Sequence, residues 1–163
     1  MTAVPPHPEK PLVRLMEERD GEETARLYQE LAAASPETHD PAVAEDEGWF
    51  FNDRASVDDD WAGFVVDLGD GRLAAMAIGR DTGEHGVVEA MVTGAEWRGQ
   101  GWGRRVLRAL LGWLYDRGVD SVLVEAEAGS EPFYAALGFA PCPGFEPGQE
   151  MQLDLNALPC DRH

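Results

Sequence analysis

The stretch Arg98-Gly99-Gln100-Gly101-Trp102-Gly103-Arg104-Arg105 joins an apolar run, residues 87–93, to a segment with helical periodicity, residues 103–117. Glycine lets the backbone turn sharply and approach a ligand without a Cβ in the way. The start of the following helix adds unpaired N–H groups and a partial positive charge, and guanidinium groups pair well with phosphate oxygens. The stretch therefore predicts an anion site at a strand-to-helix turn.

Two common phosphate-binding loops fit this stretch poorly. A P-loop ends in Lys followed by Ser or Thr, whereas Gly103 is followed by two arginines. A dinucleotide fingerprint that begins at Gly99 would need its third glycine at Arg104. The strands expected before the loop form an antiparallel meander, which also disfavours a dinucleotide fold.

The sequence on both sides of the loop predicts an α+β fold, with a mixed, mostly antiparallel central sheet flanked by helices. Alternating or β-rich runs predict strands at 12–16, 63–68, 72–79, 87–93, 121–126, 139–142 and 149–155. Apolar residues at helical spacing predict helices at 21–34, 103–117 and 130–137.

Local signals support these elements. Gly69-Asp70-Gly71 predicts a hairpin turn, and Asp20 stands three residues before Glu23, as in a capping box. Because a helix separates residues 87–93 from 121–126, these two strands are expected to be parallel. Residues 35–60 give no clear pattern beyond one or two short helices.

Composition and charge narrow the classes of partner. The 163 residues predict a single domain over 11–158, preceded by a loose Pro-rich arm at 1–10. Thirteen basic and 31 acidic residues leave a net charge of −18, which repels nucleic acid and anionic membranes and attracts cationic molecules. An acidic surface also keeps a protein soluble, so that interpretation stays open.

The cysteines and the first residues of the sequence bear on the cellular compartment. Cys142 and Cys160 cannot form a CxxC pair and are expected to be free thiols, and no signal peptide or membrane-spanning run is visible. We expect a cytoplasmic protein that is a monomer or a homodimer.

Two motifs resemble one family. Arg98-x-x-Gly101-x-Gly103 matches the R/Q-x-x-G-x-G/A signature of the GNAT superfamily of N-acetyltransferases, and residues 131–139, EPFYAALGF, are similar to its FYxxLGF segment. The order of predicted elements is also that of the family, and the resemblance covers roughly residues 12–155. It implies an acetyl-CoA-dependent N-acetyltransferase, with acetyl-CoA as co-substrate.

The resemblance also implies which residues bind acetyl-CoA. Loop N–H groups would hold the pyrophosphate, with arginines supplying charge; the loop residues are Arg98, Gly99, Gln100, Gly101, Trp102, Gly103, Arg104 and Arg105. Strand backbone at Met91 and Thr93 would pair with pantetheine, and backbone near Val92 would donate to the oxyanion. Two positions depart from the family pattern: Ala95 replaces a proline, and Glu127 stands about where an asparagine is common.

Acetyl transfer to an amine needs a base for the ammonium proton and an acid for the departing thiolate. The resemblance makes Tyr134 the general acid and Glu89 the base. Glu125 and Glu127 lie two residues apart, hence on one face of a strand, and are alternatives for the base. Packing for the tyrosine and solvation for the carboxylates are the competing interpretations.

The predicted reaction is direct attack of the amine of a small cationic substrate on the thioester, without a protein nucleophile. The histidines lack ligand spacing, so we expect no metal. A non-catalytic acyl-CoA-binding module and a protein or peptide N-acetyltransferase remain the alternatives.

Overall fold

A computed structural model describes residues 11–127, 129–142 and 150–157. The predicted arm at 1–10 and Cys160 lie outside the described residues. Cys142 is a free, buried thiol, as expected. In the described part of the chain, no helix is long and apolar enough to cross a membrane.

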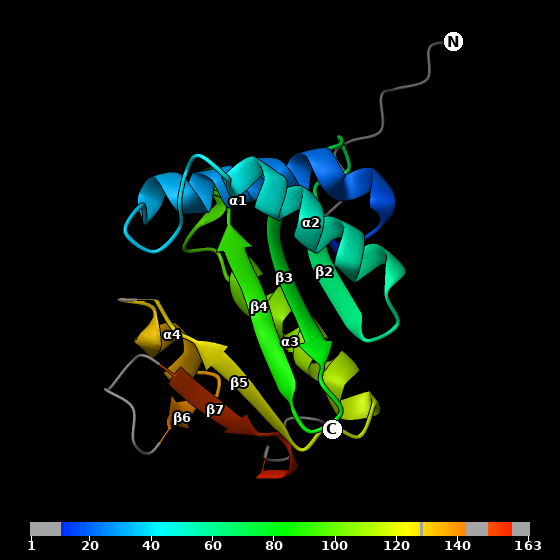
Figure 1. Ribbon diagram of the computed structural model, residues 1–163, viewed down its shortest axis with the longest axis vertical. Coiled ribbons are helices and arrows are strands. Elements are labelled where there is room, and N and C mark those ends of the chain that lie inside the picture. Colours follow the sequence, from blue (N-terminus) through cyan, green and yellow to red (C-terminus); the bar gives the residue numbers. More distant parts are fainter. Residues whose placement is uncertain (1–10, 128, 143–149, 158–163) are drawn as a thin grey trace.

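A seven-stranded sheet forms the centre of the molecule (Figure 1). Its order is β1-β2-β3-β4-β5-β7-β6, and every neighbouring pair is antiparallel except β4 and β5. The strands are β1 Leu12–Leu15, β2 Trp61–Asp67, β3 Leu73–Asp81, β4 Gly86–Thr93, β5 Ser121–Glu125, β6 Ala140–Pro141 and β7 Glu150–Asp154. The predicted α+β fold and the parallel pair are confirmed.

Helices cover both faces of the sheet (Figure 1). On one face lie α1, Gly21–Ala34, and α2, Ala44–Val57; on the other lies α3, Trp102–Asp116, while α4, Glu131–Ala135, precedes the last hairpin. The predicted helical face of α3 is buried in one core cluster, and α1 packs Leu27 and Tyr28 against β3 and β4 in a second. The sheet is thus held from both sides.

The helix at 21–34 is confirmed, but its predicted cap is wrong. Asp20 has a helical backbone and does not cap α1, because a short 3₁₀ turn, Glu18–Asp20, leads into the helix; its carboxylate instead accepts the Glu17 N–H at 2.8 Å in a capping box of that turn. Its carboxylate pairs with Arg14 of β1 at 2.9 Å, and Glu23 accepts the N–H of Leu73 at 2.9 Å. Both acids tie the start of α1 to the sheet.

Helix α2 occupies much of the segment that gave no clear pattern. Its buried residues are small or polar and recur at helical spacing: Ala44, Gly48, Asn52 and Ala55. Gly48 and Asn52 lie against α1, where a buried Thr24 hydroxyl donates to Asn52 Oδ1 at 2.9 Å, and Ala55 lies beside Gly63 of β2. The larger apolar residues Trp49 and Phe50 are exposed, so a search for a large apolar stripe could not find this helix.

Candidate active site

The sheet opens between its two parallel strands. β4 pairs with β5 only from Gly86 to Val88, opposite Val122 to Val124, and the described pairing stops there. At the same point the register of β3 and β4 shifts, from Gly79 opposite Val88 to Ile78 opposite Ala90, which leaves Glu89 as the extra residue of a bulge. The rest of β4 therefore borders a gap in the sheet.

The hydrogen-bonded ladder between β3 and β4 determines which backbone groups of β4 beyond the bulge face the gap. Gly94 N–H donates to Ala74 O at 2.8 Å, and antiparallel pairs alternate, so Val92 forms the next hydrogen-bonded pair, with Met76. Met91 and Thr93 consequently direct their N–H and C=O groups away from β3, toward the gap. The carbonyl of Thr93 accepts the Arg98 Nε–H at 3.3 Å on that side.

Because of this alternation, the backbone groups of Met91 and Thr93 face the gap, whereas those of Val92 face β3. The polar groups of Met91 and Thr93 suit pairing with an extended ligand, as the family resemblance implies. The amide of Val92 faces β3, so the neighbouring amide of Met91 is the better oriented donor for an oxyanion in the gap.

The glycine loop ends at the start of α3, beside the gap. Gly99 and Gly101 have φ angles of 78° and 87°, in the region that favours glycine. Arg105 N–H bonds to Gly101 O at 3.2 Å, so the N–H groups of the preceding residues in the first turn have no partner within the helix. A Cβ on Gly103 would lie 2.8 Å from Thr93 Oγ1, so any larger residue there would require the Thr93 side chain or the helix to move.

Charge at the loop is available to a ligand. Arg98, Arg104, Arg105 and Arg108 are exposed and form no ion pair with any described residue, whereas the seven other described arginines each contact a carboxylate. Arg105 lies over the ring of Trp102 at 5.0 Å. Unpaired guanidinium groups beside a free helix N-terminus fit a pyrophosphate or other polyanion.

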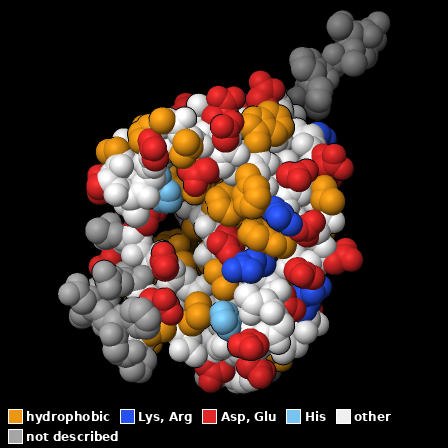
Figure 2. Space-filling model, in the orientation of Figure 1, with side chains coloured by type: hydrophobic (Ala, Val, Ile, Leu, Met, Phe, Trp, Pro, Cys, Tyr) orange, Lys and Arg blue, Asp and Glu red, His pale blue; other side chains and the backbone are white. Residues whose placement is uncertain are grey.

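A cavity of about 760 Å³ occupies the gap between β4 and β5. Figure 2 shows a hollow on this face, with acidic side chains around it. The lining side chains come from α1 and the segment after it, from β3, β4 and β5, and from α4 and β7; those with polar groups are Tyr28, Thr38, His39, Arg80, Glu89, Glu125, Glu127, Tyr134 and Glu150. All four residues that the sequence proposed for acid–base chemistry are therefore brought to one cavity.

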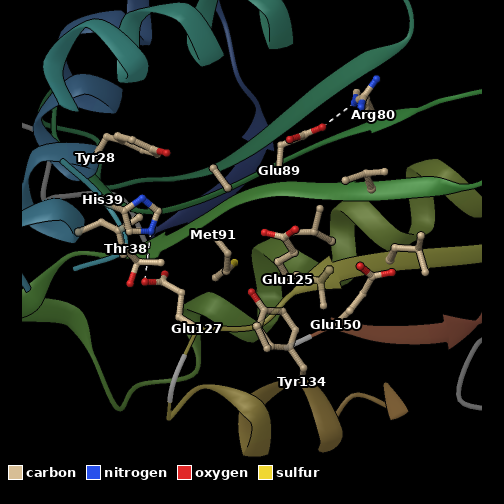
Figure 3. A pocket seen from close by; sticks show the side chains of 17 residues that line it. Tyr28, Thr38, His39, Arg80, Glu89, Met91, Glu125, Glu127, Tyr134 and Glu150 are labelled. Atoms are coloured by element: carbon tan, nitrogen blue, oxygen red, sulfur yellow. Dashed lines mark hydrogen bonds and ion pairs between the residues drawn. The ribbon is translucent and has the colours of Figure 1, made fainter. Parts of the chain in front are cut away.

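Tyr134 projects from α4 with its hydroxyl directed into the cavity (Figure 3). Its ring packs edge-on against Phe133 and Phe139, at centroid distances of 5.1 and 5.5 Å. Burial, with a contribution from Glu127, raises the pKa of Tyr134 to about 12. The phenol therefore keeps its proton through the neutral range and can donate it.

Glu89 and Glu125, two of the three candidate bases, have different surroundings. Glu89 is held by Arg80, whose Nε–H donates to its carboxylate at 2.5 Å, and Arg80 in turn lies over Trp61. Glu125 is exposed and stands directly opposite Glu150 in the β5–β7 register. Like charges in a cross-strand pair repel, so a cation between these carboxylates would be stabilised.

Sequence reasoning missed the wall formed by the segment after α1. His39 Nε2 lies 3.2 Å from Glu127 Oε1, and its ring meets Tyr28 edge-on at 5.6 Å (Figure 3). Burial, with contributions from Glu47, Glu127 and Glu89, raises the pKa of Tyr28 to about 12. No local pattern marks these residues, because they meet the cavity only through the packing of α1 and α2 on the sheet.

Comparisons with known proteins agree with this geometry. A model of the acetyltransferase (GNAT) family matches residues 24–139. No curated protein sequence matches the chain. The structure of PaiA N-acetyltransferase from Thermoplasma acidophilum, in complex with coenzyme A, is similar with a TM-score of 0.74 at 11% identity, covering 89% of this chain and 99% of that one.

Two further solved structures share the fold. The GCN5-related N-acetyltransferase from Ralstonia eutropha has a TM-score of 0.70 at 16% identity, over 84% of this chain and 97% of its own. The ribosomal-protein-S18-alanine N-acetyltransferase from Escherichia coli has a TM-score of 0.63 at 18% identity, over 90% and 94%. Identities this low show a common fold alone.

Proposed function

Because the chain belongs to the acetyltransferase (GNAT) family, whose members are acyltransferases, we propose that it transfers the acetyl group of acetyl-CoA to the amine of a small cationic molecule. This proposal rests mainly on one observation, the close placement of the glycine loop at the start of α3 and the open edge of β4. A polyanion site at the start of α3 adjoins the open edge of β4, and that edge leads to the Tyr134 hydroxyl.

Each part of acetyl-CoA has a matching region along the glycine loop, the edge of β4 and the cavity. The N–H groups of the glycine loop and of Gly103 and Arg104 would hold the pyrophosphate, and Arg98 and Arg105 would balance its charge. The polar groups of Met91 and Thr93 would pair with the amides of pantetheine. The thioester would then lie in the cavity, near Tyr134 and the bulge at Glu89.

The reaction is direct transfer. An amine that has lost its proton attacks the thioester carbonyl, the C–N bond forms, and the C–S bond breaks. Tyr134 donates its proton to the departing sulfur, so that a thiol rather than a thiolate leaves. Glu89, Glu125 and Glu127 all line the cavity and are the candidates for the base.

The charge of the cavity supports a cationic acceptor. Four carboxylates line it, and Arg80 is the lone arginine among its lining residues. Low-dielectric walls focus such a field, which raises the local concentration of cations. A lysine-bearing peptide would be attracted in the same way and remains the second acceptor class to test.

The remaining inferences follow from charge and composition. We infer that the protein acts in the cytoplasm as a monomer or homodimer, needs no metal, and binds neither nucleic acid nor a membrane surface. Its net charge of −18 supports the last point, since a polyanion would be repelled everywhere except at the arginine cluster.

Thiol release from acetyl-CoA, measured with a panel of diamines, aminoglycosides, amino acids and lysine peptides, tests the proposal. We expect turnover with at least one cationic small molecule. Tyr134→Phe should lower kcat about 10²- to 10⁴-fold with little change in CoA affinity, because the loss of a positioned acid has that size. Tyr115→Phe, on α3 and outside the cavity lining, is the matched control. CoA binding without turnover on any amine would favour a non-catalytic module.

A further inference from the structure

We propose that His39, oriented by Glu127, is the base that takes the proton from the acceptor ammonium group. This inference rests on the proposed function and refines one part of it. It assigns the role for which the carboxylates Glu89, Glu125 and Glu127 were candidates, and it makes Glu127 a positioning residue.

The imidazole of His39 is held at the cavity wall from two sides. On one side the ring meets Tyr28 of α1 edge-on, and on the other its Nε2 faces Glu127 Oε1 at 3.2 Å. Both facing atoms are shielded from solvent and form no hydrogen bond of good geometry with any described group. Such a contact tightens when the ring gains a proton, because the carboxylate then faces a full positive charge.

The pair joins two segments that line the cavity from different sides. His39 follows α1, on the wall that covers one face of the sheet, and Glu127 follows β5, on the far side of the gap. Figure 3 shows the ring between Tyr28 and Glu127, on the same cavity that the Tyr134 hydroxyl enters. An acid and a base are thus available to one bound substrate.

The competing carboxylates are less suited to the task. Glu89 is already engaged by the guanidinium of Arg80. Glu125 is exposed and faces Glu150, an arrangement that favours holding a cation over removing its proton. Imidazole, in contrast, is the side chain whose ordinary titration range spans neutral pH, where a base is most effective.

The groups that surround His39 are acidic or neutral. Glu127 faces the ring directly, while Glu47 of α2 and Glu89 of β4 act on the adjoining Tyr28. Tyr28 keeps its proton, because its pKa is raised to about 12 by burial and by these acids. The charged groups nearest the ring are therefore carboxylates.

His39 and Tyr134 together account for every proton that moves in the reaction. His39 accepts one proton from the ammonium group at Nδ1, because its Nε2 faces Glu127, and the freed lone pair of the amine forms the C–N bond. The C–S electron pair leaves with sulfur, which takes the proton of Tyr134. The nitrogen then loses its second proton to the tyrosinate, directly or through water. The products are an amide, a thiol and one proton on His39, which passes to solvent.

The test is the pH dependence of kcat for the best amine found with the wild-type protein. His39→Gln should lower kcat about 10²- to 10⁴-fold near neutral pH and remove the acidic limb of the profile. The defect should shrink as the pH rises toward the amine's own pKa, since the free amine then needs no base. CoA affinity and thermal unfolding should match wild type. His85→Gln, in the β3–β4 turn and outside the cavity lining, is the matched control.

Glu127→Gln distinguishes the two members of the pair and does not depend on the folding of the histidine variant. If His39 is the base, Glu127→Gln reduces kcat but keeps an acidic limb, because the imidazole is still present. If Glu127 is itself the base, Glu127→Gln abolishes the limb while His39→Gln keeps it, and the proposal is overturned.

Other outcomes also decide the matter. An acidic limb that persists unchanged in His39→Gln, with an effect on KM alone, would make the pair a structural link between two walls and overturn the proposal. Loss of the limb in Glu89→Gln or Glu125→Gln alone would have the same consequence. Absence of wild-type turnover on every amine, with CoA still bound, would instead overturn the proposed function.

Discussion

The contact between α1 and α2 can be tested with one methyl group. A Cβ added to Gly48 of α2 would lie 2.5 Å from Ala25 Cα and 3.1 Å from Ala25 N of α1. These are backbone atoms, which cannot rotate away. Because carbon atoms pack at roughly 3.5–4 Å, the two helices would have to separate by about 1 Å. Gly112 in α3 offers a matched control, since nothing lies within 4 Å of its added Cβ.

The two substitutions should have opposite effects on the free energy of unfolding. Gly112→Ala should stabilise by about 0.5–1 kcal/mol, the usual advantage of alanine inside a helix. Gly48→Ala gains the same propensity but should destabilise by about 1–3 kcal/mol overall, the usual cost of overpacking. The free energies of unfolding of the two variants should therefore differ by about 1.5–4 kcal/mol. Because both variants gain the same helix propensity, this difference reports the contact between the helices.

Urea unfolding of both variants, followed by circular dichroism, measures this difference as a shift of the midpoint at constant slope. Steady-state kinetics provide a second measurement. Because α1 and α2 hold His39 at the cavity, kcat/KM should fall in Gly48→Ala and stay at the wild-type value in Gly112→Ala. Equal midpoints for the two variants would refute the close approach of α2 to α1.

Three further outcomes are expected. Arg104→Gln and Arg105→Gln should each weaken CoA binding about tenfold by calorimetry, since a hydrogen bond to a charged group contributes ~1.5–3 kcal/mol; Arg54→Gln on α2 is the control, and equal affinities would remove these residues from the anion site. The kcat/KM for a cationic amine should fall as salt rises, because attraction is screened within ~8 Å at physiological ionic strength; a flat response would leave the acidic surface without a role in binding. Since the pKa of Tyr134 is raised to about 12, its proton is retained at lower pH and lost only as pH rises through that value, so kcat should stay level up to about pH 10; an alkaline limb below pH 10 that Tyr134→Phe abolishes would contradict the raised pKa of Tyr134 and not its role as the acid.

Local chemistry made much of the molecule predictable from its sequence. The glycines before α3, the apolar face of that helix and the alternation in the strands act over a few residues, so the pattern alone identified them. The loop arginines were found in the same way, whereas Tyr134 was found through the resemblance to the GNAT family. The packing of α3 and α4 beside β4 then placed those groups at one opening of the sheet.

Tertiary structure decided what depends on contacts between distant segments. Helix α2 buries small residues against α1, so its position follows from close packing and not from a large apolar stripe. Asp20 pairs with Arg14 where the local pattern suggested a cap, because an ion pair to β1 competes for the same carboxylate. His39 faces Glu127 because α1 and β5 end at the same opening of the sheet. The positions of these residues in the sequence, 88 residues apart, do not predict this contact.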